Sequence, residues 1–113
     1  MAENTIFDKI LKKEIPAAVV FEDDWVLAFK DVTPQAPIHV LVIPKRRLER
    51  FADVKQAPAT DVGEFFRRVA LVAEQLGLEK NGYRIVVNNG KDGGQTVDYL
   101  HAHILGGRRM TGL

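Results

Sequence analysis

The sequence predicts an α+β fold, in which an antiparallel sheet carries one long and one short helix. Short segments rich in β-branched and aromatic residues occur in both halves of the chain, and the longest amphipathic segment, 60–76, lies between them. Strands that precede and follow a helix, rather than alternating with several helices, favour an antiparallel sheet over a parallel one. A length of 113 residues is typical of one domain, so we expect residues 1–113 to form a single domain.

The first predicted elements are a short helix and a β-hairpin. Thr5 is a suitable N-cap for the apolar pairs that follow it within 6–11, and Pro16 ends the segment. Residues 17–22 and 25–30 are rich in β-branched and aromatic side chains and are separated by two aspartates. This pattern is typical of two antiparallel strands joined by a turn.

The middle of the chain predicts a buried strand and the long helix. Nearly every residue of 38–43 is apolar, so we expect this strand to be buried on both faces. The basic segment 45–50 is interpreted as a solvated connection, and 56–59 as a loop. Helical spacing of apolar residues then continues to residue 76, and Gly77 is suited to the position after the last turn.

Two further strands are predicted at 83–87 and 99–105, on either side of a polar, glycine-rich loop at 88–94. The end of this loop supplies backbone N–H groups and polar side chains that are able to bind an anion. The residues concerned are Gly93, Gly94, Gln95 and Thr96.

The three histidines are the candidate chemical groups, and we expect each of them to lie in a strand. His101 and His103 are two residues apart, so in a strand they project from the same face. A neutral imidazole can attack phosphorus or accept a proton, and a second imidazole can serve the leaving group. An anion-binding loop followed at once by this pair therefore indicates chemistry at a phosphate.

Two other interpretations of the histidines stay open at this stage. They could be solvated or hydrogen-bonded structural residues, or His39, His101 and His103 could supply three nitrogen ligands to a zinc ion. The zinc site is the less favoured alternative, because it leaves the anion-binding loop without a role. In addition, a histidine that binds a metal is usually oriented by a carboxylate, and no carboxylate other than Asp98 is evidently placed to do this.

Composition excludes several classes of function. The net charge is +1, too small for the long-range field that nucleic-acid or membrane binding uses, so neither partner is expected. The chain has no cysteine, which excludes disulfides and thiolate metal sites. No apolar run approaches the roughly 18 residues of a membrane span, and the polar start of the chain does not resemble a signal peptide. We therefore expect a cytoplasmic protein.

Residues 94–108, with the sequence GQTVDYLHAHILGGR, resemble the signature of the histidine triad family. Segments 5–7, 13–16, 21–24 and 31–45 resemble the branch of this family called histidine triad nucleotide-binding proteins. The resemblance therefore runs almost from end to end, with several separated motifs in the same order.

The resemblance implies a hydrolase of purine nucleoside 5′-phosphoramidates and acyl-adenylates that releases AMP and needs no metal or other cofactor. His101 matches the nucleophile that forms a covalent nucleotidyl-histidine. His103 matches a phosphate contact, His39 a support for the nucleophile's imidazole, and Thr96 a contact to the phosphate or leaving group. The family fold is an antiparallel sheet that continues across a homodimer.

The resemblance also implies which residues bind the nucleotide. Asp31 matches the carboxylate that takes both ribose hydroxyls, and several apolar residues match the pocket for the base. Ile10 matches this pocket too, but it is equally well interpreted as an ordinary core residue. The complete implied set is Ile6, Phe7, Phe29, Asp31, Val32, Asn88, Gly94, Gln95, Thr96, Val97, His101 and His103.

Two departures from the family pattern bear on activity. Tyr99 stands where the family has the first histidine of its triad, and we expect the tyrosine hydroxyl to offer a bond in the same direction. Residues 109–113 lack the tryptophan-containing tail of many relatives, which affects the choice of leaving group. The alternatives are a non-catalytic purine-nucleotide-binding or regulatory module and, less favoured, a dinucleoside polyphosphate hydrolase.

Overall fold

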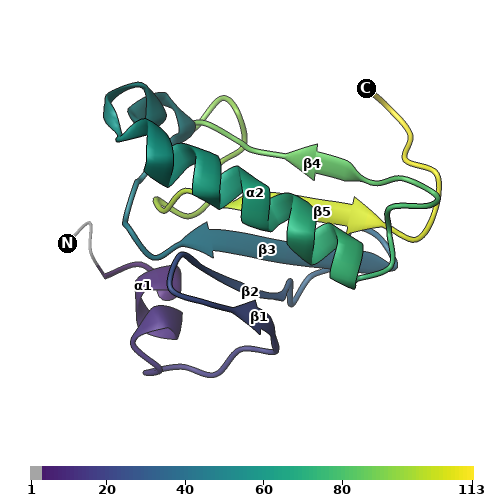
Figure 1. The fold of residues 1–113 in the computed structure, drawn as a ribbon, viewed down its shortest axis with the longest axis horizontal. Coiled ribbons are helices and arrows are strands. Elements are labelled where there is room, and N and C mark those ends of the chain that lie inside the picture. The colour runs from purple at the N-terminus through teal and green to yellow at the C-terminus, as the bar shows by residue number, and fades with distance from the viewer. Residues whose placement is uncertain (1–3) are drawn as a thin grey trace.

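The computed structural model describes residues 4–113. The elements in chain order are helix α1 (Ile6–Leu11), strands β1 (Val19–Glu22), β2 (Val26–Lys30) and β3 (Ile38–Pro44), the short 3₁₀ helix η2 (Phe51–Gln56), helix α2 (Ala59–Gln75), and strands β4 (Arg84–Val86) and β5 (Ala102–Gly106). The strands form one antiparallel sheet in the order β1-β2-β3-β5-β4, and α2 lies across one face of it (Figure 1). The predicted α+β class is confirmed.

Alternation along the strands divides the core into two clusters on opposite faces of the sheet. Val40 and Val42 of β3 pack with α2, whereas Leu41 and Ile43 pack with Phe7 of α1 on the other face. His39 is two residues before Leu41 and so lies on the same face of the sheet as Leu41 and Ile43. His103 of β5 is paired with Leu41 of β3. Strands β3 and β5 therefore present their histidines on the face that α2 does not cover.

Most predicted elements are confirmed, including both helices, the hairpin and a β3 that is buried along nearly its whole length. The last strand is shorter than predicted, because β5 begins at Ala102 rather than at Tyr99. The Leu100 N–H donates to the Leu48 carbonyl at 2.7 Å instead of joining the sheet. The prediction that every histidine lies in a strand is therefore wrong for His101, which immediately precedes β5.

The segment 45–50 is not the fully solvated connection that its charges predicted. Four of its six residues, Lys45, Arg47, Leu48 and Glu49, are half-buried. Arg47 is also tied into the fold by ion pairs with Asp8 and Glu49. The 3₁₀ helix η2 that follows was not predicted, since its sequence has neither helical nor strand periodicity.

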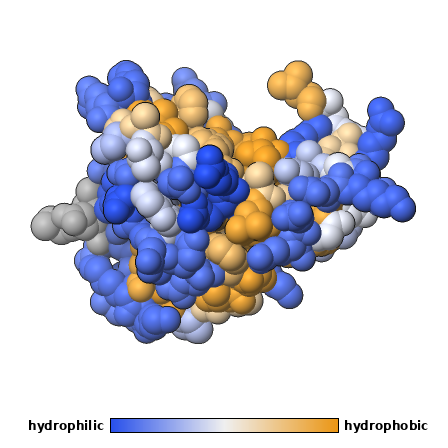
Figure 2. All heavy atoms as spheres, in the orientation of Figure 1, coloured by the Kyte–Doolittle hydropathy of each residue, from blue (hydrophilic) through white to orange (hydrophobic). Residues whose placement is uncertain are grey.

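The surface on the α2 side of the sheet mixes hydrophilic and hydrophobic residues (Figure 2). Within residues 4–113, no helix is both long and apolar enough to cross a membrane. The first three residues, on which part of the signal-peptide prediction was based, lie outside the described residues.

Candidate active site

The His101 ring is held by the main chain. Its Nδ1 lies 2.6 Å from the carbonyl oxygen of Tyr99, and the imidazole is 5% exposed. A carbonyl oxygen only accepts hydrogen bonds, so Nδ1 carries the proton and Nε2 carries the lone pair of the neutral ring. The Phe7 ring of α1 packs edge-on against His101, with ring centroids 5.0 Å apart. The geometry therefore leaves the lone pair on Nε2 of His101, the nitrogen that is able to attack an electrophile or accept a proton.

His39 and His103 form a hydrogen-bonded chain with a defined direction. The backbone N–H of Gln35 donates to Nδ1 of His39 at 3.0 Å, so Nε2 of His39 carries the proton. This Nε2 lies 2.9 Å from Nδ1 of His103, to which it donates. Nδ1 of His103 is thus an acceptor, and the remaining proton of the neutral His103 ring is on Nε2.

Asp31 is the carboxylate that accompanies these histidines. Its Oδ2 lies 3.4 Å from Nε2 of His39, and its Oδ1 accepts the backbone N–H of Thr33 at 2.8 Å. The sequence had pointed to Asp98 instead. Asp98 is exposed, and its main-chain carbonyl accepts a hydrogen bond from Arg47.

The ligand atoms of Asp31, His39 and His103 lie within 4.8 Å of one another, a spacing compatible with a metal ion. A metal bound at Nε2 of His39 would require the proton to sit on Nδ1 of that ring. Nδ1 would then face the Gln35 N–H at 3.0 Å, donor against donor. The polarity of the hydrogen bonds therefore favours a chain of imidazoles over a metal site.

Burial keeps both central imidazoles neutral. It lowers the pKa of His101, although the Tyr99 carbonyl and Asp31 oppose this effect. Burial, together with the neighbouring His101 and His39, lowers the pKa of His103 to about 4. The rings of His101 and His103 are 5.0 Å apart, so the expectation that they project together is confirmed.

Two expected contacts of His101 differ from those in the structure. The Tyr99 hydroxyl donates to the Pro44 carbonyl rather than reaching His101, and the Tyr99 side chain is 1% exposed. His39 forms a hydrogen bond with His103 and not with His101, because β3 and β5 bring residues 39 and 103 onto neighbouring positions of the sheet. The support of His101 comes from the backbone at position 99.

The glycine-rich loop differs from the predicted anion cradle at two residues. The Gln95 amide donates to the carbonyls of Glu49 and Val97, at 2.7 and 3.0 Å, and its side-chain oxygen accepts the Gly90 N–H at 2.8 Å. The Gly94 N–H is also engaged, with the Lys91 carbonyl at 3.1 Å. Gln95 and Gly94 therefore shape the loop instead of offering free donors.

Thr96 does keep donors available. It is exposed, and within residues 4–113 neither its N–H nor its hydroxyl has a hydrogen-bond partner. Asn88, at the other end of the loop, is half-buried. Val97 packs on the cluster that contains Tyr99.

The residues predicted to bind the base fall into two groups. Phe7 and Phe29 are buried and in edge-on contact, with ring centroids 5.5 Å apart, so they also serve as core. Ile6 is 52% exposed and Val32 is 97% exposed. Each of these two side chains is open to contact from outside the chain.

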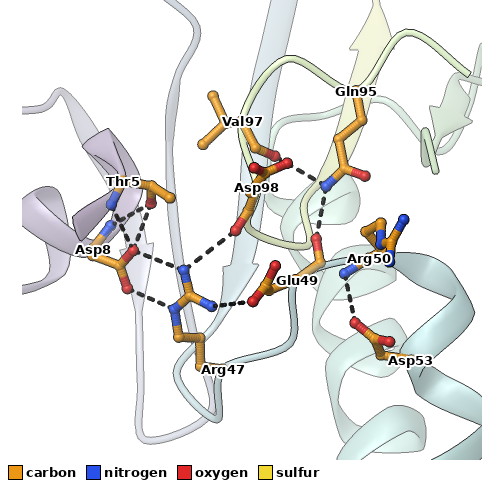
Figure 3. A network of polar contacts seen from close by, with 9 residues as sticks. All are labelled: Thr5, Asp8, Arg47, Glu49, Arg50, Asp53, Gln95, Val97 and Asp98. Atoms are coloured by element: carbon orange, nitrogen blue, oxygen red, sulfur yellow. Dashed lines mark hydrogen bonds and ion pairs between the residues drawn. The ribbon is translucent and has the colours of Figure 1, made fainter. Parts of the chain in front are cut away.

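Sequence reasoning missed a polar network beside the site (Figure 3). Arg47 pairs with Asp8 of α1, with Nε 2.8 Å from Oδ1 and Nη2 3.0 Å from Oδ2. Sequence reasoning also missed Gln35, because its backbone N–H is what donates to His39, and no side-chain pattern reveals such a contact. For Asp8 and Arg47 no local pattern gave a signal, because the two residues are 39 positions apart in the sequence.

Comparison with known proteins identifies the family. The sequence profile of the HIT domain matches residues 12–110. The chain belongs to the HIT domain family. A HIT-like protein of Synechocystis sp. is 52% identical over 108 residues, which cover 96% of this chain and 94% of the relative.

Other HIT relatives carry functional names. The purine nucleoside phosphoramidase of Escherichia coli is 44% identical over 110 residues, covering 97% of this chain and 92% of that protein. The crystal structure of a HIT family hydrolase from Legionella pneumophila superposes with a TM-score of 0.90 at 45% identity and covers 96% of both chains. The five-stranded antiparallel sheet described above is thus the HIT fold.

Proposed function

We propose that this HIT protein hydrolyses purine nucleoside 5′-phosphoramidates and acyl-adenylates to AMP through a covalent nucleotidyl-histidine on His101. The observation that carries the proposal is the hydrogen bond from Nδ1 of His101 to the Tyr99 carbonyl, which leaves a lone pair on Nε2. The name of the E. coli relative, purine nucleoside phosphoramidase, supports the substrate class.

The proposed reaction has two displacement steps. Nε2 of His101 attacks the α-phosphorus and a new P–N bond forms. In a phosphoramidate the bond from phosphorus to the amine breaks as the amine takes up a proton, and in an acyl-adenylate the bond from phosphorus to the carboxylate oxygen breaks and the carboxylate leaves as an anion. Water then attacks the same phosphorus, the bond to His101 breaks, and AMP is released. No step requires a metal or other cofactor.

His103 is proposed to act on the phosphate and His39 to hold His103. The Nε2–H of His103 is directed away from His39 and is available to a phosphoryl oxygen. Because Nδ1 of His103 accepts the hydrogen bond from His39, the neutral ring has its one proton on Nε2 and offers it to the phosphate.

The remaining site residues have proposed contacts to the nucleotide. Asp31 takes the ribose hydroxyls, and Thr96 and Asn88 contact the phosphate or leaving group. Gly94, Gln95 and Val97 fix the loop that carries Thr96. The base lies against Ile6, Phe7, Phe29 and Val32.

We also propose that residues 1–113 act as a single HIT domain that forms a homodimer through β4. This strand is at the edge of the sheet and holds only three residues, and Ile85 on it is 38% exposed. An unprotected edge with an exposed apolar residue favours pairing with a second copy.

The test is release of AMP from adenosine 5′-phosphoramidate in the presence of a chelator. We expect turnover by the native protein and a loss of about 10³-fold or more in His101→Ala, since the nucleophile is absent. Acid quenching should trap an adenylylated protein in the native sample and none in the variant.

Two results would overturn this proposal. Binding of AMP without turnover would indicate a nucleotide-binding module. Faster cleavage of diadenosine tetraphosphate than of the phosphoramidate would indicate a dinucleoside polyphosphate hydrolase.

A further inference from the structure

Arg47 connects two parts of the chain that are distant in sequence and meet at the active site. Its guanidinium forms the two-pronged ion pair with Asp8 of α1, and its Nη2 also donates to the Asp98 carbonyl at 3.2 Å. Its Cζ lies 5.0 Å from the centre of the Tyr99 ring. Arg47 therefore contacts both α1 and the segment whose carbonyl holds His101 (Figure 3).

The ion pair is built into the fold. The Asp8 side chain is 8% exposed, and the Arg47 guanidinium holds its pKa well below the usual range. Asp8 also accepts hydrogen bonds from the backbone N–H and the hydroxyl of Thr5, at 2.9 and 2.6 Å, which closes the N-terminus of α1. A planar guanidinium that meets a carboxylate with two parallel bonds fixes orientation as well as distance.

Helix α1 needs such a tie because it is only six residues long. An isolated helix of this length is not stable, so its place depends on tertiary contacts. Phe7 on this helix packs against His101, and its neighbour Ile6 is a proposed contact of the base. A displacement of α1 therefore moves the wall of the nucleoside pocket.

The catalytic segment has other anchors. Three hydrogen bonds hold it: the Leu100 N–H donates to the Leu48 carbonyl, the Tyr99 hydroxyl to the Pro44 carbonyl, and Nδ1 of His101 to the Tyr99 carbonyl. Loss of the Arg47 guanidinium leaves all three in place. Its removal should consequently disturb α1 more than it disturbs His101.

We propose that Arg47, acting through Asp8, is a positioning residue that sets helix α1 against the catalytic segment and so determines how well the enzyme recognises the nucleoside part of its substrate. This inference rests on the proposed function and assigns to it a specificity-determining pair outside the histidines. The pair touches no reacting atom.

The test compares two substrates in Arg47→Gln. One is adenosine 5′-phosphoramidate, and the other is ribose 5-phosphoramidate, which lacks the base. We expect kcat/KM for the adenosine substrate to fall roughly tenfold, mainly through KM, as loss of a charge-assisted hydrogen bond predicts. For the ribose substrate we expect a change of less than about twofold, because its groups do not reach α1.

Arg68 provides a matched control. Its side chain is 20% exposed, against 21% for Arg47, and its Nε lies 2.8 Å from Asp23 Oδ2, with Trp25 as its aromatic neighbour. It lies on the α2 side of the sheet. Arg68→Gln should leave the ratio of kcat/KM for the two substrates unchanged.

Asp8→Asn and the double variant keep the proposal testable if Arg47→Gln folds poorly. Asp8→Asn should give the same selective loss, and Asp8→Asn/Arg47→Gln should be no worse than either single variant, since the two residues act as one unit. Equal losses on both substrates, additive losses in the double variant, or the same selective loss in Arg68→Gln would overturn the positioning role.

Hydrogen exchange separates this inference from the proposed function. Without any turnover by the native protein the proposed reaction fails, but the amides of α1 still report its attachment. They should exchange faster in Arg47→Gln than in Arg68→Gln. Equal exchange in the two variants would contradict the inference whatever the activity.

Discussion

At the scale of single residues, the His103 imidazole links the site to the stability of the whole protein. Its pKa in the folded protein is about 4, below the ordinary value of 6.5, because burial and the neighbouring imidazoles disfavour the charged ring. In the unfolded chain His103 has its ordinary pKa. Between pH 6.5 and 4 the unfolded state therefore binds more protons than the folded state.

Stability should accordingly fall as the pH is lowered through this window. The contribution of His103 is present in full above pH 6.5 and is lost by about pH 4, for a total of up to about 3 kcal/mol. Urea unfolding at pH 7 and at pH 4.5 measures the difference. His103→Asn should flatten the pH dependence, and an equally steep dependence in that variant would contradict the assignment.

Residue-level prediction from the sequence succeeded where spacing alone decides geometry. The two-residue separation of His101 and His103 placed their rings together, although His101 lies outside the strand. Proton positions could not be predicted. They depend on Gln35, whose N–H reaches His39 through the fold of the loop before β3.

At the scale of elements, the backbone path of the loop between β4 and β5 requires glycine at two positions. A Cβ on Gly93 would lie 2.6 Å from the Asn89 carbonyl oxygen, and Gly94 has a φ of +86°. Both positions therefore need glycine for the backbone path, not for contact with an anion. The loop that carries Thr96 keeps its shape because these two residues have no side chains.

A pair of glycine-to-alanine substitutions tests this constraint. Gly93→Ala forces the loop to shift and should cost about 1–3 kcal/mol of unfolding free energy and lower kcat/KM. At Gly63 in α2 an added Cβ would have no atom within 4 Å. Gly63→Ala should therefore raise the unfolding free energy by about 0.5–1 kcal/mol, which is the difference in helix propensity between glycine and alanine.

Chemical denaturation of both variants gives these free energies. A Gly93→Ala protein with native stability and activity would mean that the loop has room for a side chain. A Gly63→Ala protein less stable than the native one would mean that α2 depends on a flexible residue at that point.

Element prediction succeeded for strongly periodic segments such as α2 and failed for 45–50. The charges of that segment matched a solvated connection. Asp8, however, lies in α1, and a partner so distant in sequence cannot be recognised from local patterns. The helix η2 could not be predicted for the same reason, because its Ala52 N–H donates a hydrogen bond to the Asn89 side chain in the loop after β4.

At the scale of the whole molecule, the sheet separates two tasks. The α2 face holds the larger apolar cluster, and the other face holds the histidines with Phe7 and Tyr99. Growth of the sheet at β4 would leave both faces unchanged. A dimer formed at this edge is therefore compatible with an open active site.

The dimer proposal predicts a mass of twice 12.7 kDa in sedimentation equilibrium. Ile85→Lys should shift the protein toward monomer, because a charge at an edge strand opposes pairing. A native protein that sediments as a monomer at micromolar concentration, or an Ile85→Lys variant that remains fully dimeric, would contradict the use of this edge.

The attachment of His101 to a main-chain carbonyl has a consequence for how such sequences diverge. Every residue at position 99 supplies a carbonyl, so substitution there does not remove the acceptor that fixes the His101 tautomer. The Tyr99 side chain does not contact His101 through its hydroxyl, which donates to the Pro44 carbonyl, and its ring is buried in the core. A search that demands three alternating histidines would discard this chain, whereas the carbonyl that orients His101 does not depend on which side chain stands at position 99.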